Sequence, residues 1–437
     1  MPGDTGQIII LGGVNDANQL VCNRITYSLI RALKNCHLPD PKILLRVTDE
    51  TPDDLWYLAI DCISTGIGSP LISNDNVAIK KMIEFGYEED AKNYTTSACW
   101  ELIPGNSCEQ NNISVFDWAI PFDLVGKKEN LDELDTWDKF IWAYSEHLCG
   151  HVYFMSHLTD NINWEKDPLM SFFNKSCREQ CKDISEGGAK YNNYGMLSVG
   201  LANCINSLIN IRKYVYQEKR FGLRELYEMR NKNFLCYEEV YALLKNSPKY
   251  FGTDDETEDV VGLVNWLIGR VNDTLQYFRN KYDGKMKFGL SSPGYIIMGK
   301  LNNATFDGRL DKEPYSIHIS ADDSNNVTEL INFASKLDYG KHGFNGNVVD
   351  FTMASTFIKE NQDKFIQLMK SSITVGVFQM QMNVIDSKTL IEAKKNPAKF
   401  PNLIVRVWGF SAYFKDLPIE YQDYVIERAL KNEAINY

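Results

Sequence analysis

The first 47 residues of the chain alternate between short apolar runs and an amphipathic pattern. Residues 7–11 form an apolar run that ends at two glycines, residues 20–33 carry leucine and isoleucine at helical spacing, and residues 42–47 form a second apolar run. Short apolar runs bounded by glycine are typical of strands, and a period of about 3.6 residues is typical of a helix. The order strand, helix, strand predicts an α/β fold.

The rest of the chain divides into a long helical part and a C-terminal part with its own pattern. Residues 53–67 and 77–85 are predicted helices, and residues 134–245 show mostly helical periodicity. In the C-terminal part we expect a strand-like stretch at 373–384, a helix at 387–396, a strand at 403–407 and a closing helix at 420–431. We therefore place a domain boundary after residue 372.

Composition and charge restrict the class of protein. The 437 residues are 44% hydrophobic and 12% aromatic, which is enough to bury a sizeable core. The net charge of -12 is spread along the chain, and this argues against nucleic acid as a partner because phosphate binding needs clustered lysine and arginine. The sequence shows no signal-peptide pattern and no apolar run of about 20 residues. We expect a cytoplasmic protein that does not engage a membrane.

The ten cysteines are scattered along the chain, which favours reduced thiols over a disulfide framework. Cys177 and Cys181, and likewise His147 and His151, have the four-residue spacing of metal ligands on a helix. Neither pair is accompanied by the second pair or the acidic residue that a metal site would require. The sequence therefore predicts no metal site and no bound cofactor.

Two short segments combine residue types that can carry chemistry. Residues 402–414 place Gly409 between an apolar strand and an aromatic stretch, where an isolated glycine is ordinarily a turn residue. Residues 97–101, with the sequence SACWE, place Cys99 two positions before Glu101; taken alone, such a cysteine is usually a packing residue. Residues two apart in an extended loop project to the same side, so we expect Cys99 and Glu101 to face one pocket.

Both segments resemble signatures of the glycyl radical enzymes. The family's radical site reads Arg-Val-x-Gly-Tyr/Phe with an aromatic residue three or four positions later, and Arg406, Val407, Gly409, Phe410 and Phe414 fit that pattern. SACWE resembles the Gly-Cys-x-Glu motif of the family's thiyl loop, with alanine in place of the usual glycine. Further resemblances follow in family order along essentially the whole chain: LGGVND, EGGAKYNNYG, PKYFGTDDETED, NATFDGR and QMQMNVID.

The resemblance implies a radical mechanism. Gly409 would carry the radical and take a hydrogen atom from the thiol of Cys99, whose thiyl radical would take one from the substrate, while Glu101 acts as general acid or base. Glycine suits the radical position because a planar α carbon without Cβ forms at no steric cost. Arg406, Phe410 and Phe414 would fix the radical loop, and Trp100 would wall the substrate pocket.

The resemblance also implies a fold and partners. Family members are nearly twice as long and close a ten-stranded α/β barrel, of which this chain resembles the C-terminal half, with about five strands. We expect a half-barrel domain at 1–372, with the thiyl loop near 97–105, and a glycyl radical domain at 373–437. An open half-barrel leaves strand edges unpaired, so a separate chain should supply the N-terminal half. A radical S-adenosylmethionine activating enzyme is also implied, because the radical is made after translation.

The Cys-x-Glu motif resembles that of family members that eliminate a group from a small polar substrate, which predicts a dehydratase or a C–O, C–N or C–S lyase. Decarboxylation of an aryl acetate is the close alternative, because those enzymes share the motif. The pyruvate formate-lyase reaction is disfavoured because it would require paired cysteines, whereas Cys99 is followed by Trp100. A non-catalytic structural subunit is the alternative of a different class; the presence of Gly409, Cys99 and Glu101 favours an enzyme.

Overall fold

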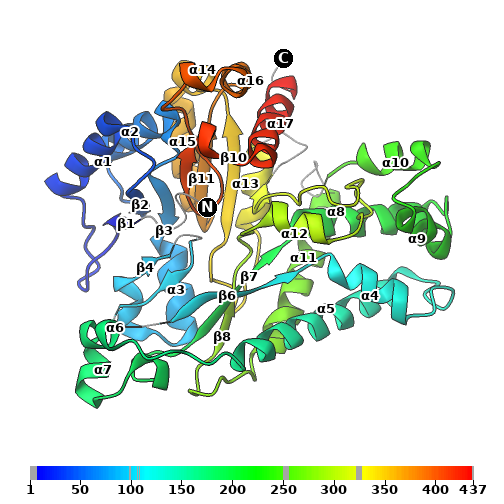
Figure 1. Ribbon diagram of the computed structural model, residues 1–437, viewed down its shortest axis with the longest axis horizontal. Helices are drawn as coiled ribbons and strands as arrows, with labels where there is room; N and C mark the ends of the chain where they lie inside the picture. Colours follow the sequence, from blue (N-terminus) through cyan, green and yellow to red (C-terminus); the bar gives the residue numbers. More distant parts are fainter. Residues whose placement is uncertain are drawn as a thin grey trace. The chain divides into compact units, whose positions relative to one another are not determined.

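The computed structural model describes residues 7–97, 100–105, 107, 109–249, 255–320 and 327–435. The chain forms two compact units, which are described separately (Figure 1). Unit 1 comprises residues 1–107, 319–336 and 346–437, and unit 2 comprises residues 108–318 and 337–345. Unit 1 thus joins the two ends of the chain, while the functional boundary after residue 372 stays a prediction. Within the described ranges, no helix is long and apolar enough to cross a membrane.

A mixed six-stranded sheet forms the centre of unit 1. Its strands, in spatial order, are β1 (Ile8–Gly12), β2 (Lys42–Val47), β3 (Leu71–Asn74), β11 (Gln379–Val384), β10 (Val348–Met353) and β9 (Ile319–Ser320). Neighbouring strands are parallel except at β3 and β11, which pair antiparallel with Ile72 opposite Met380. Every residue of β2, β3 and β11 is buried, as expected for a sheet that is covered on both faces.

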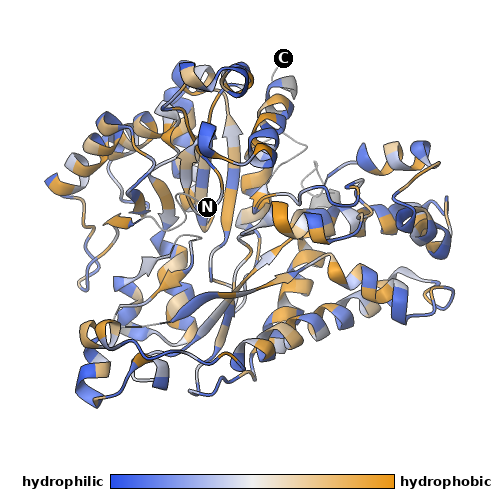
Figure 2. Cartoon of the chain, in the orientation of Figure 1, coloured by the Kyte–Doolittle hydropathy of each residue, from blue (hydrophilic) through white to orange (hydrophobic). Residues whose placement is uncertain are grey.

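Amphipathic helices cover this sheet. Figure 2 shows hydrophilic and hydrophobic residues alternating along covering helices such as α1 and α17. The helices of unit 1 are α1 (Arg24–Cys36), α2 (Asp53–Cys62, continued by a π-helical turn at Ile63–Ile67), α3 (Asp75–Phe85), α13 (Val327–Ser335), α14 (Ser355–Glu360), α15 (Gln362–Thr374), α16 (Ser387–Lys395) and α17 (Ile419–Ile435). Two short antiparallel hairpins complete the unit: β4 (Thr95–Thr96) with β5 (Leu102–Ile103), and β12 (Ile404–Arg406) with β13 (Ser411–Tyr413).

Unit 2 is built around a parallel three-stranded sheet of β6 (Gln110–Asp117), β7 (Tyr194–Val199) and β8 (Met286–Phe288). Its helices are α4 (Ile120–Lys128), α5 (Trp137–Asp160), α6 (Pro168–Phe173), α7 (Lys175–Gln180), α8 (Leu201–Ile211, continued by a π-helical turn at Arg212–Gln217), α9 (Leu223–Asn231), α10 (Glu238–Lys245), α11 (Asp255–Leu275) and α12 (Tyr295–Leu301). Unit 2 therefore contains a second, smaller sheet in addition to the helices that we expected between residues 134 and 245.

The structure confirms several predicted elements and corrects two expectations. Strand β2 has the predicted bounds, and α2 begins at the predicted residue. The number of strands that belong to a half-barrel stays a prediction. The predicted helical region 134–245 contains β7, a fully buried six-residue run that is too short for periodicity to distinguish from a helix. The stretch 373–384 is not one strand, because α15 continues to Thr374 and β11 begins at Gln379.

Candidate active site

Gly409 lies at the tip of the β12–β13 hairpin. The strands pair with Arg406 opposite Ser411, and the amide of Val407 donates a 3.0 Å hydrogen bond to the carbonyl of Phe410, which closes a tight turn around Gly409. This tip is buried, including Gly409 itself. The hydroxyl of Ser411 donates to the carbonyl of Ile67 at 3.1 Å and ties the hairpin to the end of the π-helical turn after α2. The predicted radical residue is therefore held in a short, enclosed loop.

A lysine from the central sheet contacts this tip. Lys42 is the first residue of β2, and its Nζ donates a 3.0 Å hydrogen bond to the carbonyl oxygen of Gly409. The Lys42 side chain is fully buried, at 0% exposure. No sequence pattern assigns Lys42 a role, because a lysine at the start of a strand is ordinarily directed toward solvent.

One face of β11 holds the radical hairpin. Gln379, Gln381 and Asn383 alternate along this strand and so project to the same face of the sheet. The Asn383 side chain bonds the backbone of Arg406 in both directions: its Nδ2 donates to the carbonyl at 2.7 Å and its Oδ1 accepts from the amide at 2.8 Å. Arg406 is fully buried, and its Nε donates to Oε1 of Gln381 at 3.2 Å.

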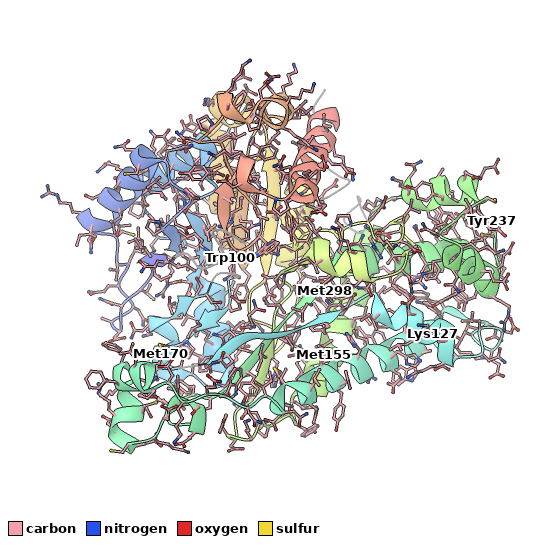
Figure 3. All side chains as sticks on the ribbon, viewed as in Figure 1. Trp100, Lys127, Met155, Met170, Tyr237 and Met298 are labelled. Carbon is pink, nitrogen blue, oxygen red and sulfur yellow. The ribbon has the colours of Figure 1, made fainter. Side chains whose placement is uncertain are left out.

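The same strand face holds the segment that carries the predicted thiyl loop. The indole Nε1 of Trp100 donates to Oε1 of Gln381 at 3.3 Å, and Nε2 of Gln379 donates to the carbonyl of Trp100 at 3.0 Å. Gln381 thus accepts hydrogen bonds from both Trp100 and Arg406. Trp100, labelled in Figure 3, lies beside the C-terminal part of unit 1. The segment QMQMNVID resembles a family segment, and the period-two spacing of its polar residues places them on one face of the strand without revealing which loops they contact.

Backbone hydrogen bonds link the described ends of the segment that joins β4 to β5. The amide of Ser97 donates to the carbonyl of Glu101, and the amide of Trp100 donates to the carbonyl of Ser97, each at 3.1 Å. Trp100 has a φ of 76°, in the left-handed region that side chains seldom adopt. The shared orientation that we expect for Cys99 and Glu101 stays a prediction. Cys99 itself lies outside the described residues.

Glu101 is the predicted general acid or base, and its side chain is fully buried in the structure. The hydroxyl of Ser97 donates to one of its carboxylate oxygens. Trp100 is also buried, at 1% exposure, and the guanidinium of Arg406 lies 6.0 Å from the centre of its ring. Its role as a pocket wall stays a prediction, while the observed contacts of Trp100 anchor the turn.

Buried charges extend the network behind Gln381. Its Nε2 donates to Oδ2 of Asp350 at 2.6 Å, and Arg428 on α17 donates to the other oxygen of that carboxylate. Gln381 and Asp350 are each 1% exposed. A buried carboxylate is stable only when it is paired and hydrogen-bonded, and Arg428 and Gln381 supply both kinds of contact.

Aromatic side chains surround the hairpin tip. Phe410 and Phe414 are buried, and the ring of Phe410 lies 5.0 Å from that of Trp408 in an edge-on arrangement. Trp408 also contacts Tyr421 on α17, with ring centres 5.6 Å apart. The role of Phe410 and Phe414 in supporting the radical loop stays a prediction, and these are the contacts through which it would operate.

The cysteines and histidines that have the four-residue spacing of metal ligands lie in differing environments. Cys177 is buried and Cys181 is exposed, and His147 pairs with Glu129 at 2.8 Å. Nε2 of His151 accepts from the amide of Asp117 at 3.1 Å, and burial lowers the pKa of His151 to about 4. The described residues contain no cluster of three or more His, Cys, Asp or Glu side chains that could hold a metal ion.

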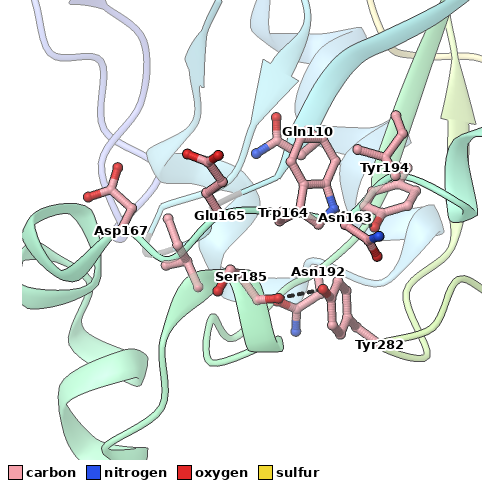
Figure 4. A pocket seen from close by; sticks show the side chains of 11 residues that line it. Gln110, Asn163, Trp164, Glu165, Asp167, Ser185, Asn192, Tyr194 and Tyr282 are labelled. Atoms are coloured by element: carbon pink, nitrogen blue, oxygen red, sulfur yellow. Dashed lines mark hydrogen bonds between the residues drawn. The ribbon is translucent and has the colours of Figure 1, made fainter.

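Unit 2 contains a separate cavity of about 510 Å³ (Figure 4). Trp164, Tyr194 and Tyr282 line it; the indole of Trp164 donates to the Tyr194 hydroxyl at 3.0 Å, and the Tyr282 hydroxyl donates to the carbonyl of Ser185. Of the predicted site residues that the structure describes, none lines this cavity. We assign it no part in the candidate active site.

Comparisons with known proteins identify the family of the chain. The sequence model of a family described as pyruvate formate lyase-like matches residues 1–296, and one described as glycine radical matches residues 317–415. The (2S)-3-sulfopropanediol dehydratase of Klebsiella oxytoca is 26% identical over 98% of this chain and 55% of its own length. The 4-hydroxyphenylacetate decarboxylase glycyl radical subunit of Clostridium scatologenes is 25% identical over 98% of this chain and 55% of its own length.

A solved structure matches as well. The glycerol-bound B12-independent glycerol dehydratase from Clostridium butyricum superimposes with a TM-score of 0.90 at 29% identity, over 97% of this chain and 56% of the dehydratase. The chain thus spans about half the length of the relatives it matches. Because the first family model alone covers more than half of the chain and the glycine radical model follows it, the chain belongs to the pyruvate formate lyase-like family of glycyl radical enzymes.

Proposed function

We propose that this chain carries the radical machinery of an enzyme that eliminates a group from a small polar substrate. The observation that carries the proposal is the shared face of β11, where Gln381 accepts hydrogen bonds from Trp100 of the thiyl-loop segment and from Arg406 of the radical hairpin. A radical relay requires its two loops to be held at a fixed separation, because hydrogen-atom transfer needs near contact between the reacting atoms. A common strand is a rigid way to hold them.

In the proposed reaction, the α-carbon radical of Gly409 takes the hydrogen atom of the Cys99 thiol. This transfer restores an ordinary glycine residue and leaves a thiyl radical on Cys99. The thiyl radical takes a hydrogen atom from a substrate carbon, and the substrate radical then loses a leaving group from the adjacent carbon. Glu101 moves the accompanying proton, as general acid-base catalysis requires. The product radical recovers the hydrogen atom from Cys99, and the thiyl radical then recovers one from Gly409, so no external oxidant is consumed.

The choice of elimination is supported by the dehydratases among the relatives. Decarboxylation of an aryl acetate is the second candidate, and the glycyl radical subunit from Clostridium scatologenes favours it. The two reactions differ in their products, since elimination releases water or another leaving group and decarboxylation releases carbon dioxide. A vicinal diol and an aryl acetate are therefore the probe substrates that separate them.

The proposal includes two partners. A separate chain would complete the ten-stranded barrel of which this chain supplies part, pairing with the outer edge of the six-stranded sheet, where β1 is the terminal strand. A radical S-adenosylmethionine enzyme would remove the α hydrogen of Gly409. Anaerobic co-purification with each candidate partner tests these assignments separately from the chemistry.

The experiment that tests the function compares Cys99→Ser with Cys181→Ser, a matched change at an exposed thiol. In the activated enzyme, Cys99→Ser should abolish turnover while the radical on Gly409 still forms, and Cys181→Ser should retain both. Turnover by Cys99→Ser would refute the thiyl assignment. If no combination of partners yields a radical, the chain is a structural subunit and not the catalytic chain.

A further inference from the structure

The contact between Lys42 and Gly409 calls for an explanation beyond chain folding. A fully buried lysine is uncommon, because removing its amine from water is costly unless the group is hydrogen-bonded. Lys42 begins a strand of the central sheet, and its Nζ reaches across to the Gly409 carbonyl at 3.0 Å, from a position 367 residues earlier in the chain. Any donor could satisfy that carbonyl, so the use of a buried lysine suggests a specific task.

The chemistry of a glycine-centred radical indicates that task. The unpaired electron on the α carbon is shared with the adjoining amide nitrogen and carbonyl, which draws electron density onto the carbonyl oxygen. A hydrogen bond donated to that oxygen stabilises the added density, and it does so more strongly in a buried site than in water. The same bond fixes the plane of the peptide that follows Gly409, and sharing of the electron requires that plane to be aligned with the radical orbital.

The sheet gives the donor a fixed position. Lys42 is followed by buried residues throughout β2, and β2 pairs with β1 and β3 on its two sides. On the other side of the contact, the hairpin tip is held by the Val407 to Phe410 hydrogen bond and by Ser411. Donor and acceptor therefore belong to two rigid elements, as a preorganised electrostatic contact requires.

We infer that Lys42 is a positioning residue that stabilises the Gly409 radical by donating a hydrogen bond to its carbonyl oxygen. This inference rests on the proposed function, since it presupposes a radical at Gly409. It predicts that Lys42 alters the properties of the radical itself. A purely structural lysine would alter only the amount of folded protein.

The test compares Lys42→Met, Lys42→Arg and a control, Lys399→Met, in the activated enzyme under anaerobic conditions. Methionine keeps an unbranched apolar stem and removes the donor, whereas arginine retains a donor. Lys399 is 70% exposed, so its replacement should leave the radical unchanged. The loss of one buried hydrogen bond corresponds to a factor on the order of ten. We therefore expect the radical in Lys42→Met to decay about tenfold faster and the radical in Lys42→Arg to remain close to wild type.

A second readout does not depend on the yield of folded protein. Electron nuclear double resonance of the wild-type radical should show an exchangeable proton at hydrogen-bond distance from the carbonyl oxygen, and its signal should be lost in Lys42→Met. A Lys42→Met radical with wild-type lifetime and an unchanged exchangeable-proton signal would overturn the inference while leaving the proposed function intact. A wild-type enzyme that forms no radical would instead refute the proposed function.

Discussion

Replacing Gln381 with leucine is the sharpest structural test of how the two loops are held together. Leucine has a similar volume but removes three hydrogen bonds at a site that is 1% exposed. Two of these bonds involve charged groups, Arg406 at 3.2 Å and Asp350 at 2.6 Å, and the third comes from the neutral indole of Trp100 at 3.3 Å.

The magnitude follows from the kind of bond. Each bond to a charged group contributes about 1.5–3 kcal/mol and the neutral bond about 1 kcal/mol, so the substitution removes on the order of 4–7 kcal/mol from the free energy of opening this region. That is a large fraction of the roughly 5–15 kcal/mol by which proteins are stable. At about 1.4 kcal/mol for each factor of ten, the local opening equilibrium shifts by about a thousandfold or more.

Hydrogen-deuterium exchange followed by mass spectrometry measures this opening directly. Peptides covering residues 100–105 and 404–413 should both lose protection in Gln381→Leu, because both depend on the same side chain. The matched control is Gln422→Leu, which removes a single 2.9 Å bond to the carbonyl of Leu417 and should cost only about 1 kcal/mol. Equal protection of both peptides in the two variants would refute the role that we give to β11.

Three further predictions concern stability. Gly68 has a φ of 67°, and a Cβ added there would lie 2.9 Å from Cβ of Arg406. Gly68→Ala should therefore lower the urea midpoint by an amount equivalent to more than about 1–2 kcal/mol, whereas Gly222→Ala, with open space around it, should leave the midpoint unchanged. Equal midpoints for the two variants would contradict this prediction. The side chains of Lys287 and Glu109 form a fully buried ion pair at 2.6 Å, so Lys287→Met should lower the free energy of unfolding by about 3–5 kcal/mol. The control is Lys166→Met, which removes the exposed ion pair with Glu186 at 3.1 Å and should lower the free energy of unfolding by only about 0–1 kcal/mol. Burial raises the pKa of Asp117 to about 7, above its usual value of 3.8, so its contribution to stability is complete below about pH 4 and is lost as the pH rises to about 7. The stability of wild type relative to Asp117→Asn, measured by urea titration, should therefore fall as the pH rises from about 4 to about 7, and a relative stability that stays constant would show that Asp117 is charged in the folded protein.

The local sequence pattern was sufficient for strand β2 and nearly so for helix α3, but not for strand β7. Strand β2 is buried at every residue, so its apolar run predicts both of its ends. Helix α3 follows β3 directly, and its side-chain cap at Asn74 marks a start two residues earlier than the apolar periodicity indicates. Strand β7 was missed because a short buried run carries no alternation.

The predicted site was accessible from sequence only in part. The signatures around Gly409 and Glu101 identify the two loops, and both residues are buried in unit 1. The contact of Lys42 with Gly409 could not be predicted, because no pattern links residues so far apart in the chain. The role of Gln381 was similarly inaccessible, since polar residues on a central strand do not reveal which loops their side chains reach.

Electron paramagnetic resonance of the activated enzyme tests the central claim most directly, when wild type is compared with Gly409→Ala and with wild type grown on glycine deuterated at the α carbon. The account predicts a radical whose signal is split by one α hydrogen, loses that splitting on deuteration and is absent from Gly409→Ala. A signal that persists in Gly409→Ala, or one whose splitting is unaffected by deuterated glycine, would contradict the assignment of the radical to Gly409.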